Sequence, residues 1–149
     1  MDKIVEALPY YFSGKVVSGF GRGSTELGCP TANVDESVVD ALPSAIQEGV
    51  YYGYARIAGG QVENMVMSIG RNPQYEGKRL TMEVHLLCTF PEPFYGKSID
   101  GLVLGFIREM HKFDSKEALV AAIQNDIAIA KEKLETEMKQ ETIQRYFKC

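Results

Sequence analysis

Between residues 10 and 113, apolar side chains occur in short runs that glycine and proline interrupt. Five of these runs are rich in Val, Ile, Tyr, Phe and Thr, the residues favoured in strands. They are Tyr11–Val17, Gly49–Ala58, Val62–Ile69, Arg79–Phe90 and Gly101–Arg108. The Gly-Gly pair within Ala58–Gln61 suits a two-residue hairpin turn, because glycine readily adopts positive φ. We therefore expect Tyr51–Ile57 to pair antiparallel with Val62–Ser68.

A helical spacing begins near Asp114. Apolar side chains there recur every three or four residues, which is the period of an amphipathic helix. They are Leu119, Ile123, Ile127, Ala130 and Leu134. The pattern predicts a helix from Asp114 to about Leu134, with Asp114 and Glu117 spaced as a capping box. The charged tail from Glu135 to Cys149 fits either a second helix or a frayed end.

The order of these segments favours a mainly β fold, in which a closed antiparallel barrel carries a C-terminal helix on its outside. A helix that follows a run of antiparallel strands buries its apolar stripe against them, and closure removes the unpaired edges of the sheet. The chain has 149 residues, within the usual size of one domain. We expect residues 1–149 to form a single domain with a core of about 10–134.

Composition and charge exclude several classes of protein. The chain is 45% hydrophobic and 24% charged, so a disordered chain is excluded. Its net charge of −4 disfavours a nucleic-acid module. The three cysteines, Cys29, Cys88 and Cys149, are too widely spaced to indicate a disulfide framework or a CxxC metal site. With no signal-peptide or membrane-span pattern, we expect a cytoplasmic protein, organellar import remaining open.

A glycine-rich segment, Gly19–Gly28, follows the first expected strand. Closely spaced glycines let backbone N–H groups approach an anion. The segment matches neither common phosphate motif: Gly28 is followed by Cys29 where a Walker A loop needs lysine, and Ser24 stands where a Rossmann fingerprint needs glycine. A phosphate-binding loop and a plain flexible loop both fit this segment.

The next segment, Pro30–Asn33, carries two oxygen-bearing side chains. In an extended chain Thr31 and Asn33, two residues apart, share one face. Hydroxyl and amide oxygens are hard ligands that suit Mg²⁺. A turn capped by the same side chains is the alternative.

The expected strand Arg79–Phe90 alternates between apolar and polar residues. One face carries Met82, Val84, Leu86 and Cys88, and the other carries Thr81, Glu83 and His85. A carboxylate within reach of a substrate hydroxyl can act as general base, which makes Glu83 a candidate. In the alternative the polar face is simply exposed to solvent and His85 is a surface residue.

The segment Arg108–Phe113 follows the last expected strand. It brings a cation, the imidazole of His111 and the ring of Phe113 next to the start of the helix. An aromatic ring can stack on a planar ligand. The alternative is a connecting loop in which Phe113 packs as a hydrophobic staple.

Taken in chain order, these segments resemble the riboflavin kinase family. The resemblance rests on GFGRGSTELGCPTAN, EGVYYGYA, MVMSIGRNP, MEVHLL, FYGK and IREMHKFDS, and spans Tyr11 to Leu134. It implies a six-stranded closed antiparallel Greek-key barrel with a C-terminal helix packed outside. It also implies transfer of the ATP γ-phosphate to the ribityl 5′-hydroxyl of riboflavin, which gives FMN and ADP.

The resemblance assigns roles to individual residues. Glu83 is the catalytic base and also contacts riboflavin. Thr31 and Asn33 hold Mg²⁺ or another divalent cation such as Zn²⁺ or Mn²⁺. The ATP site comprises Gly19, Gly21, Gly23, Thr25, Thr31, Asn33, Leu86, Cys88 and Tyr95. The riboflavin site comprises Glu83, Arg108, His111 and Phe113.

The resemblance further implies a monomer whose partners are riboflavin, ATP, FMN and ADP, without nucleic acid or membrane. Some relatives carry a second domain that adenylates FMN, with a His-x-Gly-His signature. This chain leaves no room for that domain, so we expect the reaction to stop at FMN. The alternative function is a non-catalytic barrel that binds flavin or a single strand, for which Tyr51, Tyr52 and Tyr54 would supply stacking rings.

Overall fold

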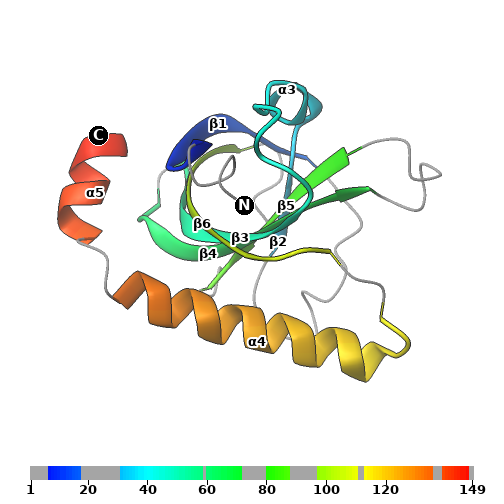
Figure 1. Cartoon of the computed structure of the whole chain (residues 1–149). Helices are drawn as coiled ribbons and strands as arrows, with labels where there is room; N and C mark the ends of the chain where they lie inside the picture. Colours follow the sequence, from blue (N-terminus) through cyan, green and yellow to red (C-terminus); the bar gives the residue numbers. More distant parts are fainter. Residues whose placement is uncertain are drawn as a thin grey trace.

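The computed structural model describes residues 7–17, 31–58, 60–71, 80–87, 97–110, 113–135 and 139–147. Within these ranges the strands are β1 (Tyr10–Val17), β2 (Thr31–Val34), β3 (Gly49–Ile57), β4 (Glu63–Arg71), β5 (Leu80–Leu86) and β6 (Ser98–Arg108). The helices are α3 (Glu36–Asp40), α4 (Lys116–Glu135) and α5 (Lys139–Tyr146). Figure 1 shows the strands wrapped into a barrel with α4 alongside it.

The strands form a closed antiparallel barrel in the order β1-β2-β5-β4-β3-β6, closed by pairing of β6 with β1. Strands β3, β4 and β5 are neighbours in sequence and in space, and β6 returns to lie beside β3, which is a Greek-key arrangement. The expected hairpin is confirmed, since β3 and β4 pair antiparallel from Gly49 opposite Ile69 to Ala55 opposite Glu63.

The expected elements need several corrections, of which the smallest are that β1 begins at Tyr10 rather than Tyr11 and β3 ends at Ile57 rather than Ala58. Strand β2 and helix α3 were not located from the sequence, because four and five residues are too few to show a period. Strand β6 begins at Ser98 rather than Gly101, and β4 runs from Glu63 to Arg71 rather than from Val62 to Ile69. Leu87 lies beyond the end of β5, and residues 79 and 88–90 of that expected strand lie outside the described ranges.

The interior of the barrel is filled by apolar side chains from alternate strand positions. Its buried members include Phe12, Val16, Val34, Tyr51, Met65, Met67, Ile69, Met82, Val84, Leu86, Ile99 and Val103. The expected apolar face of β5 is therefore confirmed for its described residues. Space for the Phe12 ring comes from Gly101, where a Cβ would lie 2.2 Å from that ring. Because the interior is filled by side chains, we infer that any binding chemistry lies on the outer surface.

Helix α4 packs on the outside of β3, β4 and β6. Its Ala130 and Ile127 lie against Val50 and Val66. The expected helix is confirmed, but its cap is not Asp114: the Ser115 Oγ accepts the N–H of Ala118 at 3.1 Å, so the capping residue is one position later. No helix within the described ranges is both long and apolar enough to cross a membrane.

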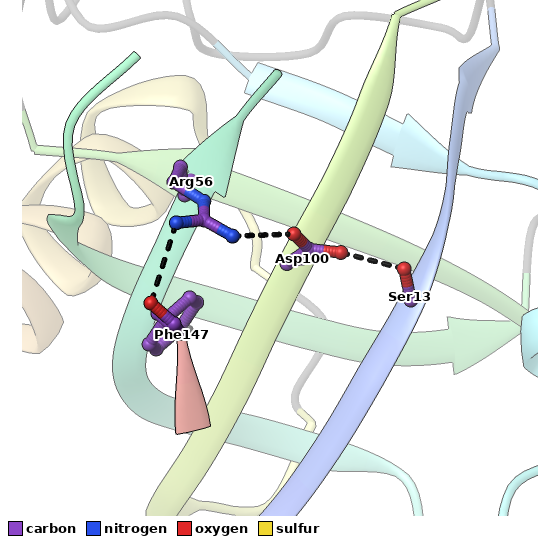
Figure 2. Close-up of polar contacts among 4 residues, drawn as sticks. All are labelled: Ser13, Arg56, Asp100 and Phe147. Carbon is purple, nitrogen blue, oxygen red and sulfur yellow. Dashed lines mark hydrogen bonds and ion pairs between the residues drawn. The ribbon is translucent and has the colours of Figure 1, made fainter. Parts of the chain in front are cut away.

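The charged tail contains a second helix, α5, which settles the alternative that the sequence left open. Phe147, directly after α5, packs against Tyr54 and Leu102 on the outer face of the barrel. Asp100 of β6 accepts a hydrogen bond from Ser13 Oγ at 2.5 Å and pairs with Arg56 at 3.1 Å (Figure 2). Arg56 Nη1 also donates to the Phe147 carbonyl at 3.5 Å. These contacts link the end of the described chain to β1, β3 and β6.

Candidate active site

Strand pairing lines up three polar residues on the outside of the barrel. Asn33 of β2 lies directly opposite Glu83 of β5, and Glu83 lies opposite Ser68 of β4. Opposed residues of antiparallel strands have Cβ atoms about 4.5–5.5 Å apart and share a face. Val34, Met82, Val84, Met67 and Ile69, which adjoin them in the chain, belong to the core, so these three side chains, all half-buried, point outward. An amide, a carboxylate and a hydroxyl thus form one row.

The extended backbone predicted for Thr31 and Asn33 is confirmed, because both lie in β2, and the capped turn is wrong. The backbone of Thr31 lies opposite His85, one row along from Asn33 and Glu83. The described residues hold no cluster of three His, Cys, Asp or Glu side chains that could bind a metal by themselves. Mg²⁺ needs no such cluster, since one or two protein oxygens and substrate phosphates suffice. The amide of Asn33 beside the carboxylate of Glu83 fits that donor set.

His85 is buried, so its interpretation as a surface residue is wrong. Only 8% of it is exposed, because it lies opposite Val66, part of the apolar cluster beneath α4. Burial lowers the pKa of His85 below its ordinary value of 6.5, which keeps the imidazole neutral at pH 7. Its Nε2 has no hydrogen-bond partner among the described residues. A neutral imidazole therefore lies roughly 7 Å along the strand from Glu83.

Arg108, at the end of β6, is held by a residue that the sequence reasoning missed. Its Nε and Nη2 each donate to a carboxylate oxygen of Asp126 on α4 at 2.8 Å. Asp126 lies on the same stripe as Ile127 and Ala130, so a carboxylate among buried apolar positions was the signal that could have revealed it. Arg108 Nη1 also donates to the Glu109 carbonyl at 3.2 Å, and the guanidinium lies over the Phe113 ring at 5.6 Å. Arg108 and Phe113 are thus in contact, and their place in a riboflavin site stays a prediction.

The residues that follow β6 lie close to the face that carries Glu83. A Cβ added to Gly70 of β4 would lie 3.1 Å from the Met110 side chain. Gly70 is opposite Thr81 of β5, two residues before Glu83. The structure therefore places the start of the β6–α4 connection beside the polar row.

Other expected site residues are placed differently or not described. The Leu86 side chain is fully buried inside the barrel, so a contact between Leu86 and ATP would have to come from its backbone. The remaining expected residues lie outside the described ranges: Gly19, Gly21, Gly23, Thr25, Cys88, Tyr95 and His111.

Comparison with known proteins identifies the family of the chain. A sequence model of the flavokinase family, described as riboflavin kinase, matches residues 6–134. Riboflavin kinase of Homo sapiens is 51% identical over 128 residues, which cover 86% of this chain and 83% of the human one. The chain belongs to the riboflavin kinase family.

Solved structures extend this likeness to the fold. The crystal structure of riboflavin kinase from Trypanosoma brucei matches with a TM-score of 0.68 and 31% identity, over 89% of this chain and 81% of that one. The crystal structure of a macrolide-efflux protein from Streptococcus pneumoniae matches with a TM-score of 0.69 and 28% identity, over 87% of this chain and 45% of that one. The barrel with its C-terminal helix is thus the fold of riboflavin kinase, and it also occurs within a longer chain.

Proposed function

We propose that the chain is an ATP:riboflavin 5′-phosphotransferase, which converts riboflavin and ATP to FMN and ADP. Membership of the riboflavin kinase family supports the reaction. The observation that carries the assignment of residues is the position of Asn33 directly opposite Glu83 on the outer face of the barrel. This pair places a carboxylate and a metal-compatible amide side by side, as transfer of a phosphoryl group to a hydroxyl requires.

In this mechanism Glu83 accepts the proton of the ribityl 5′-hydroxyl while that oxygen bonds to the γ-phosphorus of ATP. The bond from the γ-phosphorus to the bridging oxygen breaks, and ADP leaves with that oxygen. A bound Mg²⁺, held by Asn33 and Thr31, would neutralise charge on the phosphate oxygens. Most of the acceleration in phosphoryl transfer comes from positioning and electrostatics. Paired strands supply the positioning here, because their hydrogen bonds fix the backbones of Asn33 and Glu83 relative to each other.

The alternative function as a single-strand-binding barrel loses two of the three rings that favoured it, and the third, Tyr52, is itself partly buried. Tyr51 and Tyr54 are fully buried. The Tyr51 hydroxyl donates to the Gln47 carbonyl at 2.5 Å, and Tyr54 packs beneath Leu134 and Phe147. Buried rings cannot form a platform on which bases stack.

One assay tests the proposed function. Purified protein is incubated with riboflavin, ATP and MgCl₂, and the flavins are separated by chromatography. We expect FMN to form only when ATP is present and to disappear when EDTA removes the divalent cation. Parallel reactions with ZnCl₂ and MnCl₂ identify the preferred ion. Tight riboflavin binding without FMN in any of these reactions would establish a non-catalytic flavin-binding barrel instead.

A further inference from the structure

Arg108 joins helix α4 to both ends of the segment that follows β6. Two of its nitrogen atoms bind Asp126 on α4. A third donates to the carbonyl of Glu109, the first residue of the segment. The face of the guanidinium lies over the ring of Phe113. Phe113 lies three residues before Lys116, the first residue of α4. One side chain thus contacts Glu109, Phe113 and Asp126.

Asp126 determines where that guanidinium lies. The Asp126 side chain is 3% exposed, and a buried carboxylate is costly unless it is paired. Its own position is set by Ile127 and Ala130, which pack against the barrel. Two parallel bonds from one guanidinium to one carboxylate also fix the plane of the guanidinium. The packing of α4 is therefore transmitted through Asp126 and Arg108 to the ring of Phe113.

This linked group lies next to the polar row. Successive strand pairs place Glu83 opposite Ser68, Ser68 opposite Val50, and Val50 opposite Arg108. Three strand spacings separate Glu83 from Arg108, which is roughly 14 Å measured along the sheet. Met110 shortens the gap, since its side chain reaches Gly70 of β4. Met110, two residues after Arg108, therefore borders the surface on which Glu83 would act.

We propose that Asp126 is a positioning residue for riboflavin, which acts through Arg108 to hold Phe113 against the bound flavin. The proposal rests on the proposed function, because it presumes that riboflavin is the substrate. In this proposal Asp126 does not touch the flavin. It sets the place and the plane of groups that do.

The first test compares the Arg108–Asp126 pair with a second arginine–aspartate pair that lies elsewhere on the barrel. Asp126→Asn keeps the shape of the side chain and removes its charge. We expect it to raise the KM for riboflavin about tenfold, as misplacement of a bound substrate does, while the KM for ATP stays within about twofold. The matched control is Asp100→Asn, which removes the charge from the Arg56–Asp100 pair near α5. This control leaves the KM for riboflavin unchanged.

A double-mutant cycle separates positioning from a general loss of stability. If Asp126 acts through Phe113, then Asp126→Asn should weaken riboflavin binding much less in a Phe113→Leu background than in the wild type. Asp126→Glu, which restores the charge, should recover part of the lost affinity. If Asp126→Asn does not fold, the KM values for riboflavin and ATP are measured instead for Asp126→Glu and Arg108→Lys.

The outcomes distinguish this inference from the proposed function. A wild-type protein that makes no FMN overturns the proposed function. A wild-type protein that makes FMN, with an Asp126→Asn variant whose KM for riboflavin is unchanged, overturns the positioning role alone. An equal rise in the KM values for riboflavin and ATP also overturns the positioning role. The same holds if the effects of Asp126→Asn and Phe113→Leu on riboflavin binding are additive. A selective rise for riboflavin with a non-additive cycle supports the role.

Discussion

Glu83 lies directly opposite Asn33 across the pairing of β5 with β2. Neither residue lies in a loop: each belongs to a strand that is hydrogen-bonded on both sides within the closed barrel. The backbones of the two residues are therefore held opposite each other before any substrate binds. This preorganisation makes the pair sensitive to changes of chemistry that leave the strands intact, and several predictions use that sensitivity.

Replacing Glu83 with glutamine should remove the base while preserving the shape of the side chain. We expect kcat to fall by about 10²–10⁴-fold, the usual contribution of a general base, with little change in the KM for riboflavin. Initial rates of FMN formation measure both quantities. The control is Glu63→Gln, the same change at the first residue of β4. A Glu83→Gln variant with the wild-type rate would assign the proton transfer to another group.

Replacing Asn33 with alanine should weaken binding of the divalent cation. We expect the MgCl₂ concentration for half-maximal rate to rise by about tenfold or more, as the loss of a group that supports a metal does. Titration of MgCl₂ at fixed ATP measures the shift. Asn33→Asp, which keeps an oxygen at this position, should shift the titration less than alanine does. Superimposable titrations for wild type and Asn33→Ala would remove Asn33 from the metal site.

Replacing Arg108 with leucine should destabilise the protein by about 3–5 kcal/mol, because it leaves the buried carboxylate of Asp126 without its partner. Arg56→Leu is the matched comparison, since its pair with Asp100 is more exposed, at 20% and 23% for the two side chains. Its loss should cost about 1 kcal/mol or less. Urea unfolding measures both values. Equal losses of stability in the two variants would show that the burial of Asp126 does not determine how much its ion pair contributes to the free energy of unfolding.

The sequence predicted those parts of this structure that depend on local pattern. Strands β1, β3, β4, β5 and β6 and helix α4 each have enough residues to show a period of two or of 3.6. Strand β2 has too few. Pairing of Asn33 with Glu83 depends on β5 lying between β2 and β4, and that order is a long-range property that no local pattern contains.

The candidate site was predictable to a different extent. Thr31, Asn33 and Glu83 were chosen by residue type and by resemblance to a family, and the strands explain why such residues meet. The burial of His85 was missed, because it depends on how α4 covers the barrel. Asp126 was missed although a local signal was present, since a charge on a buried helical stripe requires a partner.

Stability at acid pH should depend on Asp35. The N–H of Lys15 donates to its carboxylate at 2.7 Å, and Ser37 also donates to it; these bonds lower the pKa of Asp35 from its ordinary value of 3.8. A carboxyl whose pKa is lowered by folding stabilises the fold above its unfolded pKa, and this contribution is lost as pH falls through the folded pKa.

The Asp35→Asn variant should therefore lose less stability than the wild type when the pH falls below about 4. Melting temperatures measured across the acid range test this expectation. Asp40→Asn, at the other end of α3, controls for the loss of one negative charge. Curves for Asp35→Asn and wild type that stay parallel down to pH 2 would contradict it.

Replacing Gly53 with alanine should strain the barrel at the pairing of β3 with β6. A Cβ at Gly53 would lie 1.9 Å from the Leu102 carbonyl oxygen, and a backbone atom held in the barrel has little freedom to move. We expect a loss of about 1–3 kcal/mol, typical of overpacking, measured by urea unfolding. Gly60→Ala, where the nearest atom is 3.2 Å away, should cost less. Equal losses of stability for Gly53→Ala and Gly60→Ala would show that the close approach of Gly53 to Leu102 is not the source of strain.

The position of β6 in the barrel has a consequence during synthesis. This strand is the last to be made, yet it pairs with both β1 and β3. Until it emerges from the ribosome, β1 and β3 each keep an unpaired edge, and such edges are templates for pairing with other chains. The hydrogen bond from Ser13 to Asp100 cannot form until Asp100 has been made, 87 residues later. The ribosome adds about 5–20 residues per second. The barrel therefore cannot close until about 4–17 s after Ser13 is made, so the speed of translation, and not only the stability of the folded protein, affects how long these edges stay unpaired.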